Sequence, residues 1–230
     1  MVYIILPLTL PSGETHNLIL HPHTSPQFMT PERRNKLLGV LKRRQSNLTV
    51  VLENVFDPHN VSAVMRTCDA VGIQDMYTIN TRIPPHKEWG FKSSSSARQW
   101  VTAHQFTSVE ECFETLRSKY DKILTTHLCD DSVSVYDIDF KGSIALIFGN
   151  ETYGVSEDIR VLADGNFLIP QMGIIRSLNI SVACAVSIYE AYRQKNLAGQ
   201  YDTSSLPQQR RMELFEEWGF KEQDIPAEEL

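Results

Sequence analysis

Short runs of apolar and β-branched residues alternate with longer stretches of helical pattern along the middle of the chain. These runs predict strands over residues 48–53, 75–79, 122–126, 143–149 and 167–170. The fourth run, SIALIFG, has no polar alternation, which is typical of a strand buried on both faces of a sheet. Strands that alternate with helices indicate an α/β fold with a mostly parallel sheet.

Capping residues place the helices between these strands. Asp57 followed by Pro58 predicts a helix that begins there and runs to about residue 71, since Asp is a favoured N-cap and Pro a favoured first residue. Thr107 and Glu110 have the spacing of a capping box for a second helix. A last long helix is expected over residues 179–196.

The two ends of the chain differ from its middle. Residues 1–28 match no element pattern and are taken as an N-terminal extension, followed by a main domain over residues 29–200 and a helical tail over residues 201–230. Thr30 and Pro31 have the pattern of a helix start, so we hypothesise that translation begins at the preceding Met29. An intact-mass measurement that includes the first 28 residues would reject that hypothesis.

Composition excludes several classes of protein. With 230 residues, 42% of them hydrophobic, the chain can bury a core, and it has no run of 18 apolar residues that would span a membrane. The apolar residues 1–11 lack the basic flank and cleavage site of a signal peptide. The four cysteines form no C-x-x-C pair, so we expect no metal, free thiols and a cytoplasmic location.

Charge is distributed unevenly along the chain, whose net charge is −6. Residues 32–44 hold six basic side chains against one acid, whereas residues 210–230 hold three basic side chains against seven acids. The basic run suggests a local anionic partner, although a solvated helix face would have the same composition.

Three stretches remain after common motifs have been sought. The chain has no dinucleotide or P-loop glycine pattern and no nucleophile elbow, so a nicotinamide-dependent oxidoreductase is poorly supported. The remaining stretches are NVFDPHNVSAVMRT (54–67), FGNETYG (148–154) and IPQMGIIRSLNIS (169–181). Each joins a strand end or a helix start to polar residues. Because ligands bind at the carboxyl ends of parallel strands, we expect all three stretches at one edge of the sheet.

Taken in this order, the three stretches resemble the signature motifs of the SPOUT methyltransferase superfamily, and specifically its TrmH branch. The resemblance extends from about residue 29 to residue 201. It implies a deep trefoil knot on the C-terminal side, a homodimer, and S-adenosyl-L-methionine as cofactor. The implied reaction is methyl transfer to a ribose 2′-hydroxyl of RNA, and the branch implies tRNA with guanosine 18 of the D-loop as the target.

The resemblance also assigns roles to residues. It implies catalytic roles for Asn60, Arg66, Glu151, Ser177 and Asn179. It implies cofactor contacts, largely through backbone groups around the adenine and ribose, at Thr126, Gly149, Ile169 and Leu178, and the glycine there lets the backbone approach a ligand closely. The basic helix would follow the RNA backbone with Arg33, Arg34, Lys42, Arg43 and Arg44.

Each residue also has an ordinary structural interpretation. Asn60 is an unremarkable residue for the first turn of a helix, Arg66 for a helix surface, and Ser177 or Asn179 for an N-cap. Six residues along a helix turn the side chain by about 600°, so Asn60 and Arg66 point about 120° apart. A joint role for this pair therefore requires neighbouring segments or a second subunit.

Two further functional interpretations stay open. The same chemistry on ribosomal RNA or on another tRNA position would use the same motifs. A non-catalytic RNA-binding dimer would keep the fold without the reaction, and a failure to bind S-adenosylmethionine in calorimetry would favour it.

Overall fold

The computed structural model describes residues 4–9, 15–20, 29–85, 97–129, 132–150, 152–174 and 177–226. Its contacts divide the chain into two units, Met1–Leu37 and Leu38–Leu230. In the first unit, strands β1 (Ile4–Thr9) and β2 (Thr15–Leu20) pair as an antiparallel ladder. The sequence pattern of residues 1–28 did not predict these two strands.

Helix α1 (Pro31–Leu41) begins in the first unit, and Thr30 caps it as the sequence predicts. The Thr30 hydroxyl accepts a hydrogen bond from the backbone N–H of Arg33 at 3.2 Å. Such a bond satisfies one of the N–H groups that a helix start leaves without a partner.

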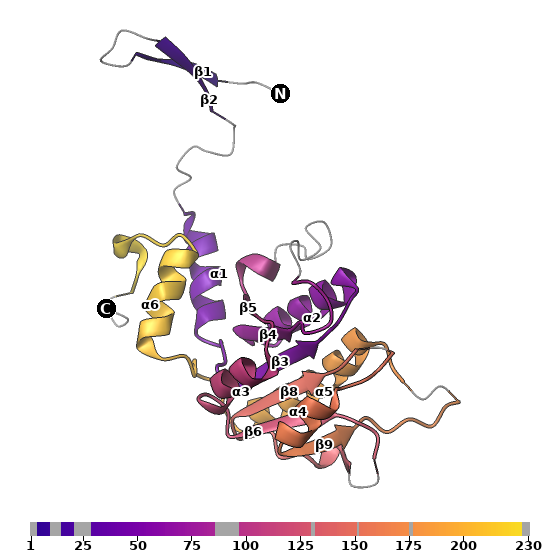
Figure 1. The fold of residues 1–230 in the computed structure, drawn as a ribbon. Coiled ribbons are helices and arrows are strands. Elements are labelled where there is room, and N and C mark those ends of the chain that lie inside the picture. Colours follow the sequence, from indigo (N-terminus) through magenta and orange to yellow (C-terminus); the bar gives the residue numbers. More distant parts are fainter. Residues whose placement is uncertain are drawn as a thin grey trace. The chain divides into compact units, whose positions relative to one another are not determined.

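A seven-stranded sheet organises the second unit, with strand order β5-β4-β3-β8-β6-β9-β7 (Figure 1). Every pair of neighbours in it is parallel, which confirms the predicted α/β class. The strands are β3 (Leu48–Glu53), β4 (Asp75–Ile79), β5 (Thr102–Phe106), β6 (Lys122–Thr126), β7 (Val133–Ser134), β8 (Ile144–Phe148) and β9 (Gly165–Leu168).

Helices cover both faces of this sheet. The helices after α1 are α2 (Pro58–Ala70), α3 (Val109–Arg117), α4 (Glu157–Leu162), α5 (Ile180–Leu197) and α6 (Gln208–Glu217), with the short 3₁₀ helices η1 (Ala97–Gln99), η2 (Val135–Asp137) and η3 (Glu222–Asp224). One core joins α2 and α5 to one face of the sheet, and a second core joins α3 and α4 to the other.

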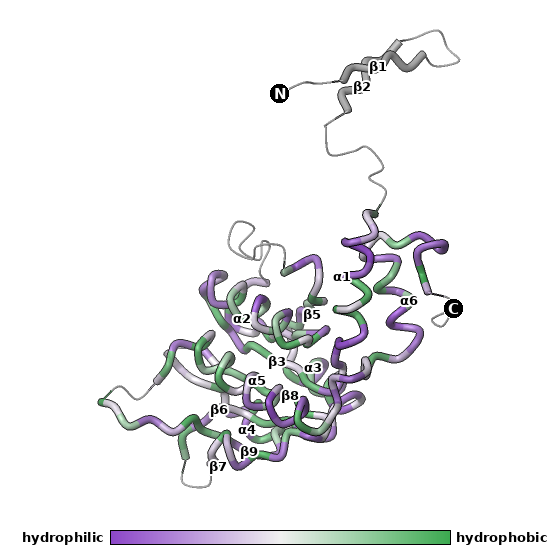
Figure 2. Tube along the Cα trace, turned by 180° about the vertical axis from the view of Figure 1, so that it is seen from behind, coloured by the Kyte–Doolittle hydropathy of each residue, from purple (hydrophilic) through white to green (hydrophobic). Residues whose placement is uncertain are grey.

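The central strands show why both faces are covered. Val50 and Leu52 of β3 lie in the first core, whereas Val51 between them lies in the second. All six residues of β3 are buried, and hydrophobic residues are concentrated along the central strands (Figure 2). A strand whose residues are buried on both sides is what a parallel sheet covered on both faces requires. No helix among the described residues is long and apolar enough to cross a membrane.

The helix starts follow the predicted capping chemistry with one shift. The Asp57 carboxylate accepts the backbone N–H of His59 at 2.8 Å, which confirms the start of α2. For α3 the cap is Ser108 and not Thr107, because the Ser108 hydroxyl accepts the N–H of Glu111 at 3.2 Å. Thr107 and Ser108 are adjacent and are both suitable N-cap residues, so the sequence alone could not distinguish them.

Candidate active site

A cavity of about 480 Å³ opens at the carboxyl ends of β6, β8 and β9. Thr126 is the last residue of β6, Gly149 follows β8, and Ile169 follows β9, and all three line the cavity. Because neighbouring parallel strands end at the same edge, residues far apart in sequence meet here. The volume lies within the range of about 300–1,000 Å³ that is usual for small-molecule sites.

The segment before α5 closes another side of this cavity. Ser177 and Leu178 line it, so all four residues expected at the cofactor and one expected catalytic residue share a single cavity. The buried rings of Phe148 and Phe167 also line it, and their centroids lie 6.0 Å apart in a T-shaped arrangement. The cavity thus combines aromatic surface with the backbone groups that follow the ends of strands.

A tight turn after β8 forms the boundary of the cavity. Asn150 and Gly154 exchange backbone hydrogen bonds of 3.1 and 2.8 Å, and the Asn150 side chain accepts the N–H of Thr152 at 2.8 Å. A Cβ on Gly149 would overlap the backbone of Gly154 and Val155. The need for glycine at position 149 therefore comes from the turn itself as well as from any ligand.

The end of β3 and the residue after it are joined to the loop that follows β8 by two hydrogen bonds. The Asn150 amide donates to the backbone oxygen of Asn54 at 2.8 Å, and the carboxylate of Glu53 accepts the N–H of Ser156 at 2.8 Å. Glu53 is only 2% exposed, and Asn54 has a left-handed backbone with φ of 49°. The loops that follow β3 and β8 are thus held together.

A second cavity of about 370 Å³ adjoins the first and is lined by Glu53, Asn54 and Arg82. The two cavities share Tyr153, whose side chain is 77% exposed. Sequence reasoning missed Glu53 and Tyr153 as site residues. The sequence could have indicated Glu53, because it is a carboxylate at the end of a mostly apolar predicted strand.

Asn179 connects the third motif with the first. Its side-chain oxygen accepts the backbone N–H of Ser181 at 2.9 Å, so Asn179 is the N-cap of α5, as one of its two interpretations predicts. Its amide donates to the side-chain oxygen of Asn60 at 3.1 Å. Ser177 does not cap the helix and faces the cavity instead.

Arg66 lies apart from this assembly within one chain. It is exposed on α2, it does not line either cavity, and no carboxylate of the described residues pairs with it. This placement agrees with the angle of about 120° that separates Arg66 from Asn60 on a helix. Glu151, the remaining expected catalytic residue, lies outside the described residues.

The basic run divides into three groups. Arg33 and Arg34 belong to α1 in the first unit, and Lys42 and Arg43 are exposed just after that helix. Arg44 is 0% exposed, so its expected contact with RNA is wrong.

Arg44 has a structural role instead. It pairs with Asp69 at 2.6 Å and donates to the backbone oxygens of Trp100 and Ile73 at 3.1 and 3.2 Å. Burial lowers the pKa of the Arg44 guanidinium, and the charge of Asp69 opposes that effect. A buried charge of this kind requires such partners.

Metal ligands are not grouped in this part of the molecule. Within the described ranges, no three His, Cys, Asp or Glu side chains are arranged to hold a metal ion. Cys68 and Cys184 are free thiols, as expected, and both are buried in the core.

The chain is similar in sequence to a known protein family and to known enzymes. The model of the SpoU rRNA methylase family matches residues 47–189. The chain belongs to this family. It is 38% identical over 191 residues to the tRNA (guanosine(18)-2′-O)-methyltransferase of Thermus thermophilus. The matched region covers 82% of this chain and 96% of the Thermus protein.

Solved structures of SpoU proteins resemble the chain as well. The crystal structure of the A. aeolicus TrmH/SpoU tRNA modifying enzyme matches with a TM-score of 0.75 at 32% identity, over 81% of this chain and 94% of that one. The SpoU methyltransferase AviRb from Streptomyces viridochromogenes, in complex with the cofactor AdoMet, matches with a TM-score of 0.61 at 25% identity, over 68% and 62% of the two chains.

Proposed function

We propose that the protein transfers the methyl group of S-adenosyl-L-methionine to the ribose 2′-hydroxyl of guanosine 18 in tRNA. One observation carries the proposal: three loops from distant parts of the sequence meet around a single cavity of about 480 Å³ at the carboxyl edge of the sheet. The Thermus relative, with its stated tRNA activity, makes tRNA the favoured substrate over ribosomal RNA.

Thr126, Gly149, Ile169 and Leu178 would hold the cofactor. Backbone groups that follow three strand ends can bond an adenine and a ribose, and the Phe148 and Phe167 rings offer apolar surface beside them. When bound, the cofactor supplies an electrophilic methyl group on its sulfonium.

The residues of the chain would then position the acceptor and stabilise its charge. Arg66 would contact the phosphate beside the acceptor ribose and stabilise negative charge on the 2′-oxygen. A guanidinium keeps its proton at physiological pH, so Arg66 would donate hydrogen bonds while water or phosphate takes the hydroxyl proton. Asn60, Asn179 and Glu151 would hold the loop of Ser177 in place for this geometry.

A homodimer would bring Arg66 to the cavity of a second copy. Helix α5 buries Cys184 and Ile188 against the sheet, yet its other side leaves Val182 and Tyr189 47% and 49% exposed. A helix that is apolar on both sides is usually covered on both sides. The position of β9 between β6 and β7, which precede it in the chain, favours the implied trefoil knot.

Calorimetric titration with S-adenosylmethionine tests the cofactor part of this proposal. We expect the wild-type protein to bind the cofactor and Thr126→Phe, which fills the cavity, to lose that binding. Thr203→Phe is the matched control because Thr203 is exposed and lies outside the cavity. A wild-type protein that binds RNA but no cofactor would support the non-catalytic RNA-binding alternative instead.

A further inference from the structure

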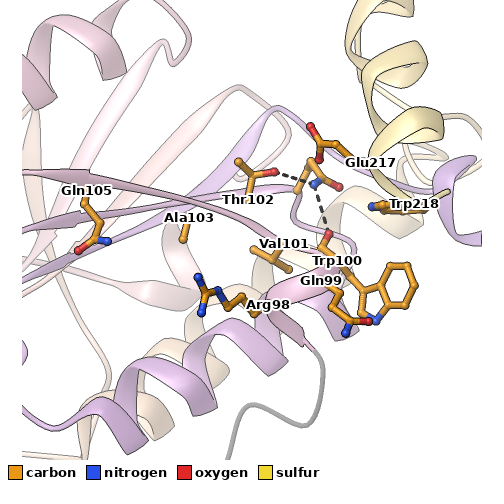
Figure 3. A pocket seen from close by; sticks show the side chains of 10 residues that line it. Arg98, Gln99, Trp100, Val101, Thr102, Ala103, Gln105, Glu217 and Trp218 are labelled. Atoms are coloured by element: carbon orange, nitrogen blue, oxygen red, sulfur yellow. Dashed lines mark hydrogen bonds between the residues drawn. The ribbon is translucent and has the colours of Figure 1, made fainter. Parts of the chain in front are cut away.

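The cavity of about 480 Å³ at the candidate active site, the cofactor cavity, has an unusual charge pattern. No Lys, Arg, Asp or Glu occurs among the described residues that line it, and His127 is the one side chain among them that can carry a positive charge. A cavity of about 330 Å³ at the amino ends of β4 and β5 differs, because both Arg98 and Glu217 line it (Figure 3). His127 is therefore the lining residue to consider for contact with an anionic group of a ligand.

Helix α4 holds the His127 side chain in one orientation. His127 directly follows Thr126, the last residue of β6, and its Nε2 lies 3.1 Å from Nη1 of Arg160. Nη2 of Arg160 pairs with the Glu157 carboxylate at 2.6 Å. A guanidinium can only donate hydrogen bonds, so the imidazole accepts at Nε2. The imidazole is then neutral, and its proton is on Nδ1.

The Nδ1 N–H of His127 is a donor that the protein does not use. No acceptor for it exists among the described residues. The side chain is half-buried, and Nδ1 is not one of the enclosed polar atoms that lack a partner, so a ligand can reach it. The hydrogen bond that Nε2 accepts polarises the ring, which strengthens the Nδ1 N–H as a donor.

Two other polar side chains of the cofactor cavity have their donors directed into the protein. The Thr126 hydroxyl donates to the backbone oxygen of Ile147 at 3.3 Å. The Asn150 amide donates to the backbone oxygen of Asn54 at 2.8 Å. These donors hold the loops in place, whereas the donor of His127 is available to a ligand.

The cofactor cavity has an apolar side and a polar side. Phe148, Phe167 and Ile180 line it and belong to the core that joins α5 to one face of the sheet. His127 is bonded instead to α4, which packs on the other face through Ile159. S-adenosylmethionine has a similar division, with a flat adenine at one end and an amino acid at the other. The carboxylate of that amino acid is its anionic group.

We propose that His127 holds the carboxylate of S-adenosylmethionine through its Nδ1 N–H, and that Arg160 is a positioning residue for His127. Hydrogen bonds to an ionised acceptor are about twice as strong as those between neutral groups. A fixed carboxylate would also limit rotation of the chain that carries the sulfonium, which favours alignment for methyl transfer. This inference rests on the proposed function, because it takes this cofactor as the ligand.

Two ligands that differ in the carboxylate alone test the contact. S-adenosylhomocysteine has the carboxylate, and S-adenosyl-3-thiopropylamine has the same nucleoside, thioether and amine without it. Calorimetric titration of each variant with both ligands compares their affinities. A substitution that merely disturbs the cavity would weaken both ligands alike, whereas loss of a carboxylate contact would weaken S-adenosylhomocysteine alone.

Two substitutions separate the nitrogens of His127. His127→Gln keeps an acceptor for Arg160, because its amide follows Cδ as Nε2 does, but it has no donor at the position of Nδ1. Its affinity for S-adenosylhomocysteine should fall by about 10- to 100-fold, the effect of one hydrogen bond to a charged group. His127→Asn has an amide nitrogen on Cγ, where Nδ1 is, and should stay within about 3-fold of the wild type. Both variants should bind S-adenosyl-3-thiopropylamine as the wild type does.

Arg160→Met tests the positioning role. It removes the donor to Nε2, so the proton of the imidazole is no longer fixed on Nδ1. Affinity for S-adenosylhomocysteine should fall by about 3- to 10-fold, with no change for the amine analogue. His59→Gln is the control for replacing a histidine, since His59 is exposed and does not line the cofactor cavity.

The outcomes separate this inference from the proposed function. Wild-type affinity for S-adenosylhomocysteine in His127→Gln, or an equal loss for both ligands, would overturn the carboxylate contact. A wild-type protein that binds neither ligand would overturn the proposed function together with this inference. The expected ligand pattern in a protein that methylates no RNA would keep the contact and remove the proposed reaction. If His127→Gln does not fold, Arg160→Met decides, because its side chain is partly exposed at 33% and tolerates the change.

Discussion

Asn179 performs two tasks that substitution can separate. Its oxygen caps α5, and its amide nitrogen bonds to Asn60. Asn179→Ala removes both interactions. The loss of an N-cap costs about 0.5–2 kcal/mol, and the hydrogen bond adds about 0.5–1.5 kcal/mol, so we expect about 2 kcal/mol of lost stability. Asn179→Ser keeps a capping hydroxyl but is too short to reach Asn60.

Urea denaturation and methyl transfer measured on the same two variants test this reasoning. Asn179→Ser should retain stability within about 0.5 kcal/mol of the wild type, because serine is an equally favoured N-cap. It should still lose methyl transfer, since the loop of Ser177 would no longer be tied to Asn60. A serine variant that is as unstable as the alanine variant would refute the capping role. A serine variant with full activity would refute the positioning role.

Three other changes give further tests. Gly149→Ala should lower thermal stability and abolish cofactor binding, because the added Cβ would overlap the turn at Gly154. Gly142→Ala is the control and should do neither, since there is open space around Gly142. Equal behaviour of the two variants in calorimetry and thermal melts would contradict this expectation. Burial lowers the pKa of Lys195 to about 8, partly opposed by a nearby aspartate. Between that pH and the ordinary value of 10.5 the unfolded chain holds more protons, so stability should rise with pH, by at most about 1.4 kcal/mol per pH unit. In urea denaturation between pH 8 and pH 10, Lys195→Met should lack this rise in the free energy of unfolding. Parallel curves of stability against pH for the variant and the wild type would contradict the expectation. Arg66→Ala should lower kcat by about 100- to 1,000-fold and leave the affinity for the cofactor unchanged. The pH–rate profile of Arg66→Lys tests whether a guanidinium is needed. A lysine variant with a near-native rate would exclude that need.

Strands that are buried on both faces could be predicted from the sequence. The bounds of β3, β4 and β6 agree with the predicted ranges because apolar and β-branched residues dominate each of them. Strand β5 was missed, since TAHQF is an edge strand that is mostly half-buried and carries polar residues. The last strand begins at Gly165 and not at residue 167, because pairing of Gly165 with Leu124 of β6 sets its start.

Sequence motifs located the loops of the candidate site, but partners distant in sequence decided the role of single residues. Arg44 reads as one more cation of a basic run, yet Asp69, 25 positions away, holds it in the core. Gln74 belongs to no motif, yet its buried amide donates to the backbone oxygen of Trp100, 26 positions away. Local pattern carries no information about such encounters.

The identity of the methylated atom decides whether the protein methylates the ribose of guanosine 18 in tRNA. The full chain would be incubated with labelled S-adenosylmethionine and unmodified tRNA transcripts, and the labelled nucleotide would be mapped. We expect a single 2′-O-methylguanosine at position 18 of the D-loop. Label on a base, or no label in any RNA despite bound cofactor, would contradict it.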